Sequence, residues 1–150
     1  MEVFDAPLPL YVQDLMQTTQ KDWSTNADRN ETILVLNADY DQRPLTQDRE
    51  VPGLSYTITK VKVPPLYPFC KSTLLTQHQD DVLDGEVIRR NSYEAVDAVP
   101  WNAKEAYQLY WGSGYLNQYL LCYEDSIVEI DFGWEPTAEQ MAIVGQKIGR

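Results

Sequence analysis

The sequence holds only one histidine, His78, and only two cysteines, Cys70 and Cys122. A lone histidine cannot build a multi-histidine metal centre, and two cysteines cannot build a cysteine-rich one. His78 falls at the end of a predicted helix, where a surface or capping role is expected rather than catalysis. The cysteines are interpreted as two separate buried thiols, with one disulfide between them as the alternative. We therefore predict no metal and no cofactor.

Basic residues and long hydrophobic runs are also scarce. The 150 residues include 12 Lys and Arg against 23 Asp and Glu, which gives a net charge of −11. Nucleic acid and anionic membrane are disfavoured as partners, because phosphate binding needs clustered basic side chains. No apolar run reaches the ~20 residues that a membrane span requires. The phosphate-loop, dinucleotide, zinc-protease and serine-hydrolase motifs are absent as well.

The clearest pattern in the chain is a predicted β-hairpin over residues 117–132, NQYLLCYEDSIVEIDF. In its second strand, apolar residues alternate with Glu129 and Asp131, so one face is expected to be buried and the other wet. A longer loop with a shifted register is an alternative, because the loop lacks Asn-Gly or Asp-Gly. A two-residue loop at 124–125 predicts the cross-strand pairs Tyr119–Ile130, Leu121–Val128 and Cys122–Ile127.

Helix signals flank this hairpin on both sides. Asn102 and Glu105 form a capping-box pattern, and apolar residues then recur at helical spacing as far as Tyr110, with glycines after them. Thr137 and Gln140 repeat the capping pattern before a second apolar stripe. These signals predict one helix near residues 102–110 and another over residues 137–148.

The upstream half shows weaker patterns. In the predicted strand over 54–63, the apolar alternation shifts by one residue, which indicates a bulge or a change in what covers the strand. The first two strands are expected to be hairpin partners, and the third to be an edge strand. The predicted elements are a short helix over 10–16, a loop over 17–30, strands over 32–40, 54–63 and 86–96, and a helix over 67–78.

The order of these elements predicts a single α+β domain over residues 1–150. An extended, loop-rich entry segment is expected at residues 1–31, and the core at residues 32–150. The core is predicted to be a mainly antiparallel sheet of about five strands, with about three helices packed on one side.

Acidic side chains offer three candidates for chemistry. Glu129 and Asp131 share a predicted strand face, and paired carboxylates can perform acid–base work on sugars, but a wet sheet face explains them better. Residues 37–41 have alternating oxygen ligands like the start of a calcium loop, but Gln42 stands where such a loop needs glycine. The acidic residues 80–86 are interpreted as a solvated turn. No catalytic residue is assigned.

Aromatic residues crowd the segment from residue 101 to residue 115. Such side chains suit the recognition of carbohydrate, peptide or protein. Helical spacing makes Tyr110 a core candidate as well, and the most exposed members are expected to be Trp111 and Tyr115. The candidate residues for binding a ligand or partner are Trp111, Tyr115, Trp101 and Tyr110.

Four segments of the sequence resemble a group of uncharacterised proteins of Gram-positive (Firmicute) gut bacteria. The segments are 7–15 (PLPLYVQDL), 99–112 (VPWNAKEAYQLYWG), 117–132 as quoted above, and 135–145 (EPTAEQMAIVG). In that group, the matching region looks like the extracytoplasmic part of a membrane-anchored protein of unknown function. The resemblance implies that Met1 is not the native start and that the parent protein has a membrane anchor outside this sequence. It implies no catalytic or ligand residues.

The expected function is therefore a non-enzymatic extracytoplasmic module for sensing or protein interaction, with another protein or a cell-envelope ligand as partner. One alternative is a small hydrolase that acts on carbohydrate or peptide through carboxylates such as Glu129 and Asp131. Another alternative is a cytosolic structural or interaction protein. A disulfide between Cys70 and Cys122 would favour an oxidising compartment.

Overall fold

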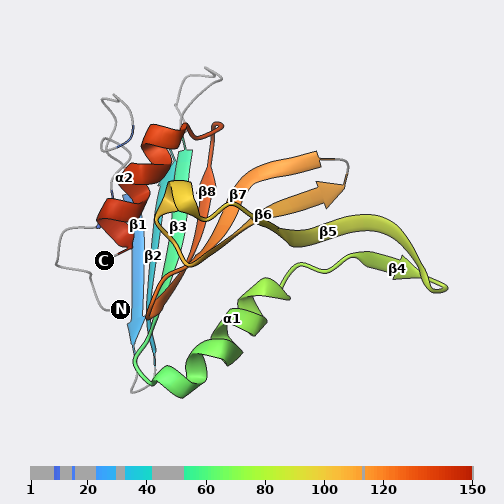
Figure 1. Cartoon of the computed structure of the whole chain (residues 1–150), viewed down its shortest axis with the longest axis horizontal. Helices are drawn as coiled ribbons and strands as arrows, with labels where there is room; N and C mark the ends of the chain where they lie inside the picture. The colour runs from blue at the N-terminus through green and yellow to red at the C-terminus, as the bar shows by residue number, and fades with distance from the viewer. Residues whose placement is uncertain are drawn as a thin grey trace.

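The computed structural model describes residues 9–10, 15, 23–29, 33–41, 53–112 and 114–149 (Figure 1). This part contains two α-helices, α1 (Tyr67–Leu75) and α2 (Ala138–Ile148), and two 3₁₀ turns, η2 (Pro64–Leu66) and η3 (Val99–Trp101). Its strands are β1 (Trp23–Arg29), β2 (Ile33–Asp41), β3 (Gly53–Val61), β4 (Asp81–Leu83), β5 (Glu86–Val96), β6 (Glu105–Gly112), β7 (Gly114–Cys122) and β8 (Ser126–Phe132).

The strands are antiparallel and follow the order β1-β2-β3-β8-β7-β6-β5-β4. Most neighbours in the sheet are also neighbours in the chain, but β3 pairs with β8 across a long separation in sequence. The α+β class and the antiparallel sheet are thus confirmed. The predicted numbers are wrong: the described residues form eight strands rather than about five, and two α-helices rather than about three.

The predicted central hairpin is β7 and β8. Its observed pairs include Tyr119 with Ile130, Leu121 with Val128 and Cys122 with Ile127. The Tyr123 amide donates to the Ser126 carbonyl at 2.9 Å, which leaves Glu124 and Asp125 as the loop. The two-residue loop is confirmed, and the shifted register is excluded.

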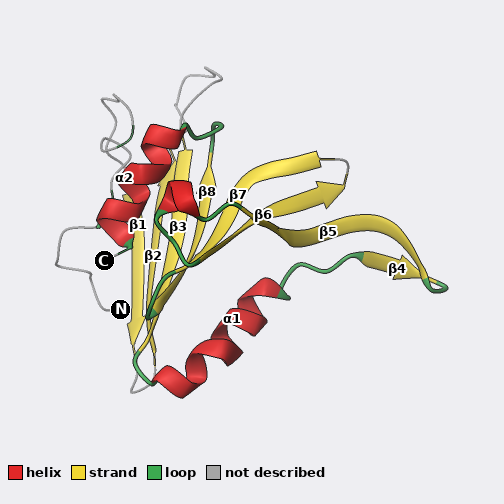
Figure 2. Ribbon diagram, in the orientation of Figure 1, coloured by secondary structure: helices red, strands yellow, loops and turns green. Residues whose placement is uncertain are grey.

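Alternate residues of this hairpin enter two separate cores. Leu121 of β7 shares one core with Val144 of α2. Its neighbour Leu120 belongs to a second, smaller core, against which Leu74 of α1 packs. Because successive strand residues point to opposite faces, α2 and α1 lie on opposite faces of the sheet (Figure 2). The predictions of helices on one side and of a wet face beneath the hairpin are both wrong.

The predicted helix near residues 102–110 is also wrong, because β6 occupies most of that segment. Asn102 does not cap a helix. It takes the left-handed conformation (φ 51°, ψ 37°) that ends η3. The following residues are rich in Tyr, Leu and Trp, which fit strands well. Pairing with β5 on one side and β7 on the other outweighs the local helical spacing.

Two other segments differ from expectation. The predicted loop over residues 17–30 contains β1, which pairs along its length with β2. The predicted turn over residues 80–85 contains β4, and the turn itself is Asp84 and Gly85, with φ values of 53° and 82°. Two positive φ values in succession are the signature of a type I′ hairpin turn. β4 and β5 therefore form a hairpin.

The remaining predicted elements in the described region are present, but β5 is not the edge strand that was predicted, because β4 lies beyond it in the sheet. The predicted helix over 67–78 is α1, the strands over 32–40 and 54–63 pair as β2 and β3, and the strand over 86–96 is β5. In β3, Tyr56 and Thr59 are both buried although they point to opposite faces. The pairings of β3 with β2 and with β8 show no register shift between these residues. The one-residue shift in the apolar alternation therefore reflects a change in what covers the strand, and not a bulge.

Some predictions fall on residues outside the described part. Of the short helix predicted over 10–16, the structure describes only Leu10 and Leu15, and both are buried. Tyr56 donates a hydrogen bond of 2.6 Å to the Leu10 carbonyl. Residues 37–41 of the calcium-like pattern belong to β2, whereas Gln42 is not described. Within the described residues, no helix has the length and apolar character needed to span a bilayer.

The predicted C-terminal helix is α2, and it sits very close to η3. The capping box of Thr137 and Gln140 is present, with the Gln140 amide donating to Thr137 Oγ1 at 3.1 Å. Gly145 faces the backbone of Trp101, and a Cβ built on Gly145 would lie 2.4 Å from the Trp101 carbonyl oxygen. A side chain at this position therefore forces α2 away from the sheet.

We expect Gly145→Ala to destabilise the protein by roughly 1–3 kcal/mol through overpacking. Helix propensity alone predicts the opposite sign, a gain of about 1 kcal/mol. Urea unfolding followed by circular dichroism measures the difference. Gln146→Ala, on the exposed side of the same helix, is the control and should be neutral or slightly stabilising. A stabilised Gly145→Ala variant would show that α2 does not pack as described.

Candidate functional site

The four aromatic candidates lie in different environments. Trp101 is buried, with an exposed fraction of 1%, and its ring centroid lies 4.8 Å from that of Tyr119. Its carbonyl accepts a hydrogen bond of 2.9 Å from the Tyr123 hydroxyl. Trp101 therefore belongs to the core beneath α2 and cannot reach a partner, which corrects the prediction that it binds one.

The other three candidates lie near the turn between β6 and β7. Tyr110 and Tyr115 form an edge-to-face pair across the two strands, with ring centroids 5.0 Å apart. Tyr115 and Trp111 are exposed, as predicted. The rings of Trp111 and His78 meet edge to face with centroids 5.8 Å apart, and the His78 ring also contacts that of Tyr93. The structure thus joins one predicted aromatic residue to two residues that were not assigned to any site.

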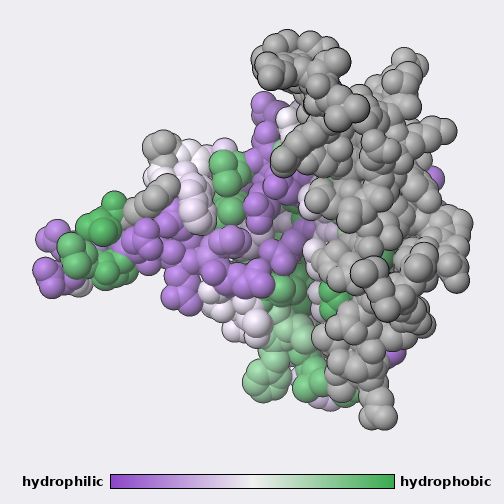
Figure 3. Space-filling view, turned by 180° about the vertical axis from the view of Figure 1, so that it is seen from behind, coloured by the Kyte–Doolittle hydropathy of each residue, from purple (hydrophilic) through white to green (hydrophobic). Residues whose placement is uncertain are grey.

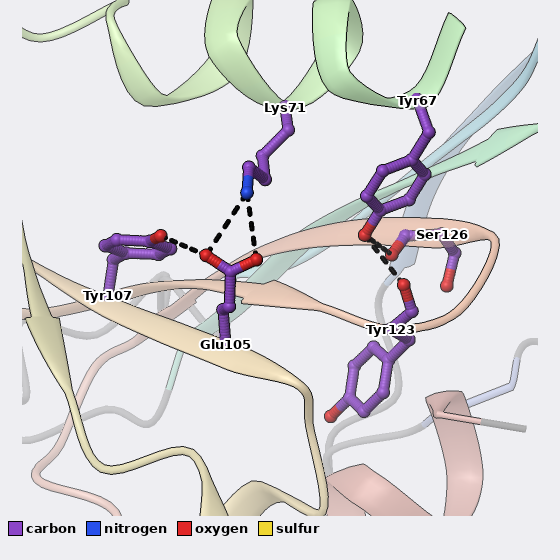
Figure 4. A network of polar contacts seen from close by, with 6 residues as sticks. All are labelled: Tyr67, Lys71, Glu105, Tyr107, Tyr123 and Ser126. Carbon is purple, nitrogen blue, oxygen red and sulfur yellow. Dashed lines mark hydrogen bonds and ion pairs between the residues drawn. The ribbon is translucent and has the colours of Figure 1, made fainter. Parts of the chain in front are cut away.

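Polar contacts attach α1 to its face of the sheet (Figure 4). Lys71 forms an ion pair with Glu105 at 2.8 Å, and Tyr107 donates a hydrogen bond to the same carboxylate. Tyr67 donates to the Tyr123 carbonyl at 2.7 Å. The hydrogen bonds from Lys71 and Tyr107 hold the pKa of Glu105 below its ordinary value. Glu105 is therefore a structural acceptor for α1 and not a proton donor at neutral pH.

Beside α1 the structure leaves a recess of about 510 Å³. No residue of α1 is fully buried, so the helix covers this face of the sheet only in part. Apolar atoms dominate the wall, and Glu129 also lines it. The lining residues are Val35 and Thr57 of the neighbouring strands, Thr59, Phe69, Cys70, Thr73, Leu74, Gln77 and Glu129.

A second hollow of about 190 Å³ adjoins the recess. Thr57 and Glu129 line both hollows, so the two lie side by side. We call the pair the α1 recess, with an apolar half and a polar half. The polar half is lined by side chains or backbone of Ser55, Tyr56, Thr57, Gln118, Glu129, Ile130 and Asp131.

Glu129 is the central acid of the α1 recess. Its Oε2 accepts a hydrogen bond of 3.1 Å from Tyr93, whose oxygen accepts one of 3.1 Å from Gln118. Burial raises the pKa of Glu129, while the bond from Tyr93 and the charge of His78 act in the opposite direction. Asp131 lies two residues further along β8 and is exposed. The predicted shared face of these two acids is confirmed, but Glu129 is not on a solvated surface.

A second feature projects from the body of the protein. Pairing of β5 with β6 begins at Arg90, so β4, the Asp84-Gly85 turn and the start of β5 extend beyond the sheet (Figure 1). We call residues 81–89 the arm. Hydrophobic surface gathers on the arm among hydrophilic residues (Figure 3). Its aliphatic side chains, with their exposed fractions, are Val82 at 59%, Leu83 at 60%, Val87 at 55% and Ile88 at 63%.

The sequence carried only part of the signal for these features. The Asp84-Gly85 turn flanked by aliphatic residues is a recognised hairpin pattern. It could have revealed the arm. Nothing local marks Tyr93, which reaches Glu129 from β5, or Gln118, whose side-chain amide donates to Tyr93. The recess itself depends on the height at which α1 sits above the sheet.

The two thiols are free and lie in the same small core. The disulfide alternative, which would favour an oxidising compartment, therefore gains no support. Burial raises the pKa of Cys122 to about 11, so its thiol is protonated and unreactive near neutral pH. Across the described ranges, no three His, Cys, Asp or Glu side chains gather as metal ligands do.

Comparisons with known proteins add no relative. No protein-family model, curated protein or solved structure matches the chain. The residues themselves therefore carry the functional argument.

The raised pKa of Glu129 predicts how stability changes with pH. The folded protein holds this proton more tightly than the unfolded chain, so stability falls as the pH rises from the ordinary value of 4.5 through the folded pKa. Glu129→Gln keeps an acceptor for Tyr93 but removes the charge. We expect this variant to gain stability relative to wild type on going from pH 4 to pH 7, as measured by urea unfolding.

The control is Glu124→Gln in the exposed β7–β8 loop, which should show no such gain. Carbon-detected NMR titration of the Glu129 carboxyl gives its pKa directly. A measured pKa at or below 4.5 would contradict the burial of this side chain.

Proposed function

We propose that this chain is a non-enzymatic interaction module that binds another protein through the arm. We further propose, on the resemblance to membrane-anchored proteins of Gram-positive bacteria, that it works on the outer side of the membrane. The observation that supports the interaction role is the exposure of four neighbouring aliphatic side chains at the end of a projecting hairpin. Val82 and Val87 are paired on one face of the hairpin, and Leu83 and Ile88 lie on the other. Exposed apolar surface of this kind marks interaction sites in soluble domains.

The geometry of the arm favours recognition over a purely structural role. Its Asp84-Gly85 turn has the conformation that best fits a twisted hairpin, so the aliphatic residues are held in one arrangement. A side chain that is already ordered loses less entropy on binding. Hairpins that serve only as connections are expected to carry polar side chains at such positions.

Charge indicates what kind of partner fits. Four carboxylates accompany the aliphatic residues in the arm and at its base, namely Asp80, Asp81, Asp84 and Glu86, against two basic residues, Arg89 and Arg90. These acids repel nucleic acid and anionic lipid headgroups. They also oppose insertion into a bilayer, because burying a charge in hydrocarbon is costly. The complementary surface is that of a protein with an apolar strip beside basic side chains.

Site-specific photocrosslinking tests this proposal. A benzophenone amino acid replaces Leu83 of the full parent protein in its native bacterium, and the cells are then irradiated. We expect a discrete covalent adduct with a second protein, because benzophenone reacts only with atoms in contact. The double variant Val82→Ser and Ile88→Ser in the same background should abolish the adduct. Both positions are exposed, so the substitutions should change stability by less than about 0.5 kcal/mol.

The matched control places the same benzophenone at Gln146, which is exposed on α2. The same adduct from both positions, or no adduct from position 83, would overturn the proposal. An adduct of twice the chain's mass would show that the partner is a second copy. Mass spectrometry of the adduct identifies which protein is captured.

A second candidate function is hydrolysis of carbohydrate or peptide, since Glu129 and Asp131 line the same hollow. One acid is partly buried with a raised pKa and the other is exposed, which is the division that separates a general acid from a carboxylate base or nucleophile. Hydrolysis of nitrophenyl glycosides and peptide anilides separates the candidates. An enzyme would lose activity at least 100-fold in Glu129→Gln and in Asp131→Asn, whereas a binding module gives equal background rates in all three proteins.

A further inference from the structure

The α1 recess joins two chemically different halves. Its larger half is walled by apolar parts of α1, including Phe69 and Leu74, and by Val35 of β2. Its smaller half offers hydroxyl, amide and carboxylate groups. A single ligand in contact with both halves must therefore carry an apolar part and a polar head. The apolar half alone, at about 510 Å³, is within the range of small-molecule sites.

The charges around the polar half define the head. Among the described residues that line it, the charged ones are Glu129 and Asp131, and both are acids. His78, which follows α1 in the chain, is the basic side chain that lowers the pKa of Glu129. Lys71 lies on α1 too, but its ammonium is engaged by Glu105 at 2.8 Å. The described charged groups of the polar half are thus acids, which favours a cationic head over an anionic one.

Hydrogen bonding leaves Glu129 able to receive such a head. Its Oε2 accepts from Tyr93, which orients the carboxylate. A carboxylate has about four lone-pair positions, so one bond from Tyr93 does not exhaust its capacity. An ammonium carries three donors, which suits a site with carboxylate, amide and hydroxyl oxygens in reach.

We propose that the α1 recess binds a small organic cation, a primary ammonium with a short apolar tail. The ammonium lies at Glu129 and Asp131, and the tail lies along α1 over Leu74 and Thr73. This inference is independent of the arm, because no residue of the arm lines the recess. It adds a ligand site to a module whose proposed partner is a protein.

Three probes that differ only in the head test the proposal: 4-phenylbutylamine, 4-phenylbutanol and 4-phenylbutanoate. Each is titrated into the ¹⁵N-labelled protein at pH 7.5 and followed by backbone NMR. A ligand of this size is expected to bind with a Kd of roughly millimolar. We expect the amine to bind at least tenfold more tightly than the butanoate, with shifts that map to α1, β3 and β8.

Variants assign the binding to the two acids. Glu129→Gln should weaken binding of the amine at least fivefold, and its NMR spectrum reports whether the fold is kept. Asp131→Asn changes an exposed residue that belongs to neither core. This variant should weaken binding of the amine as well. Glu139→Gln makes the same change of charge on α2, on the other face of the sheet, and should leave the affinity unchanged.

Several results would overturn the proposal: no binding of the amine, equal affinity for amine and butanoate, or an affinity unaffected by both acidic variants. Shifts spread over the whole surface would likewise show non-specific attraction to a chain of net charge −11. The arm variant Val82→Ser and Ile88→Ser should bind the amine like wild type. Loss of crosslinking at the arm and loss of amine binding are therefore separate outcomes.

Discussion

The hydrogen-bonded pair of β7 and β8 is the constraint on which the other elements depend, because both of its faces are buried. Leu120, Leu121, Ile127 and Val128 have exposed fractions of 0%, although neighbouring residues point to opposite sides of the sheet. A strand pair of this kind requires cover from both directions. The chain supplies α2, η3 and the buried Leu10 on one side and α1 on the other. The position of each helix follows from this requirement.

α2 packs closely on its face of the sheet and α1 packs loosely on the other, and this difference produces the α1 recess. α2 has three fully buried residues and places Gly145 against the backbone of η3, which leaves no space. α1 has none: Leu74 and its neighbours only partly bury themselves on the smaller core, and polar contacts of Tyr67 and Lys71 also attach the helix. Polar tethers set a distance between helix and sheet without filling the space beside them. A carboxylate such as Glu129 can lie there partly desolvated and still reachable.

The sequence predicted features that depend on neighbouring residues and missed those that depend on distant ones. The register of β7 and β8 follows from a two-residue loop and strict alternation, so it could be derived locally. The capping pattern at Asn102 was equally local and misleading, because β6 gains more by pairing with β5 and β7 than by forming a helix. β1 carries mainly polar residues, so only its pairing with β2 reveals it. Glu129 and Asp131 were found, but Tyr93 and Gln118 come from other strands.

The arm is fixed at its base by one buried polar side chain. The backbone N–H of Asn91 donates to the Asp80 carboxylate at 2.8 Å. The side-chain nitrogen of Asn91 donates to the Asp81 carboxylate at 3.2 Å, and its side-chain oxygen accepts from the backbone N–H of Gly112 at 3.2 Å. Asn91 is 5% exposed, so leaving these groups without partners would be costly. They tie the start of β4 to the end of β6 at the point where the arm leaves the sheet. The aliphatic residues beyond Asn91 are therefore presented on an oriented extension of the sheet, as a recognition surface requires.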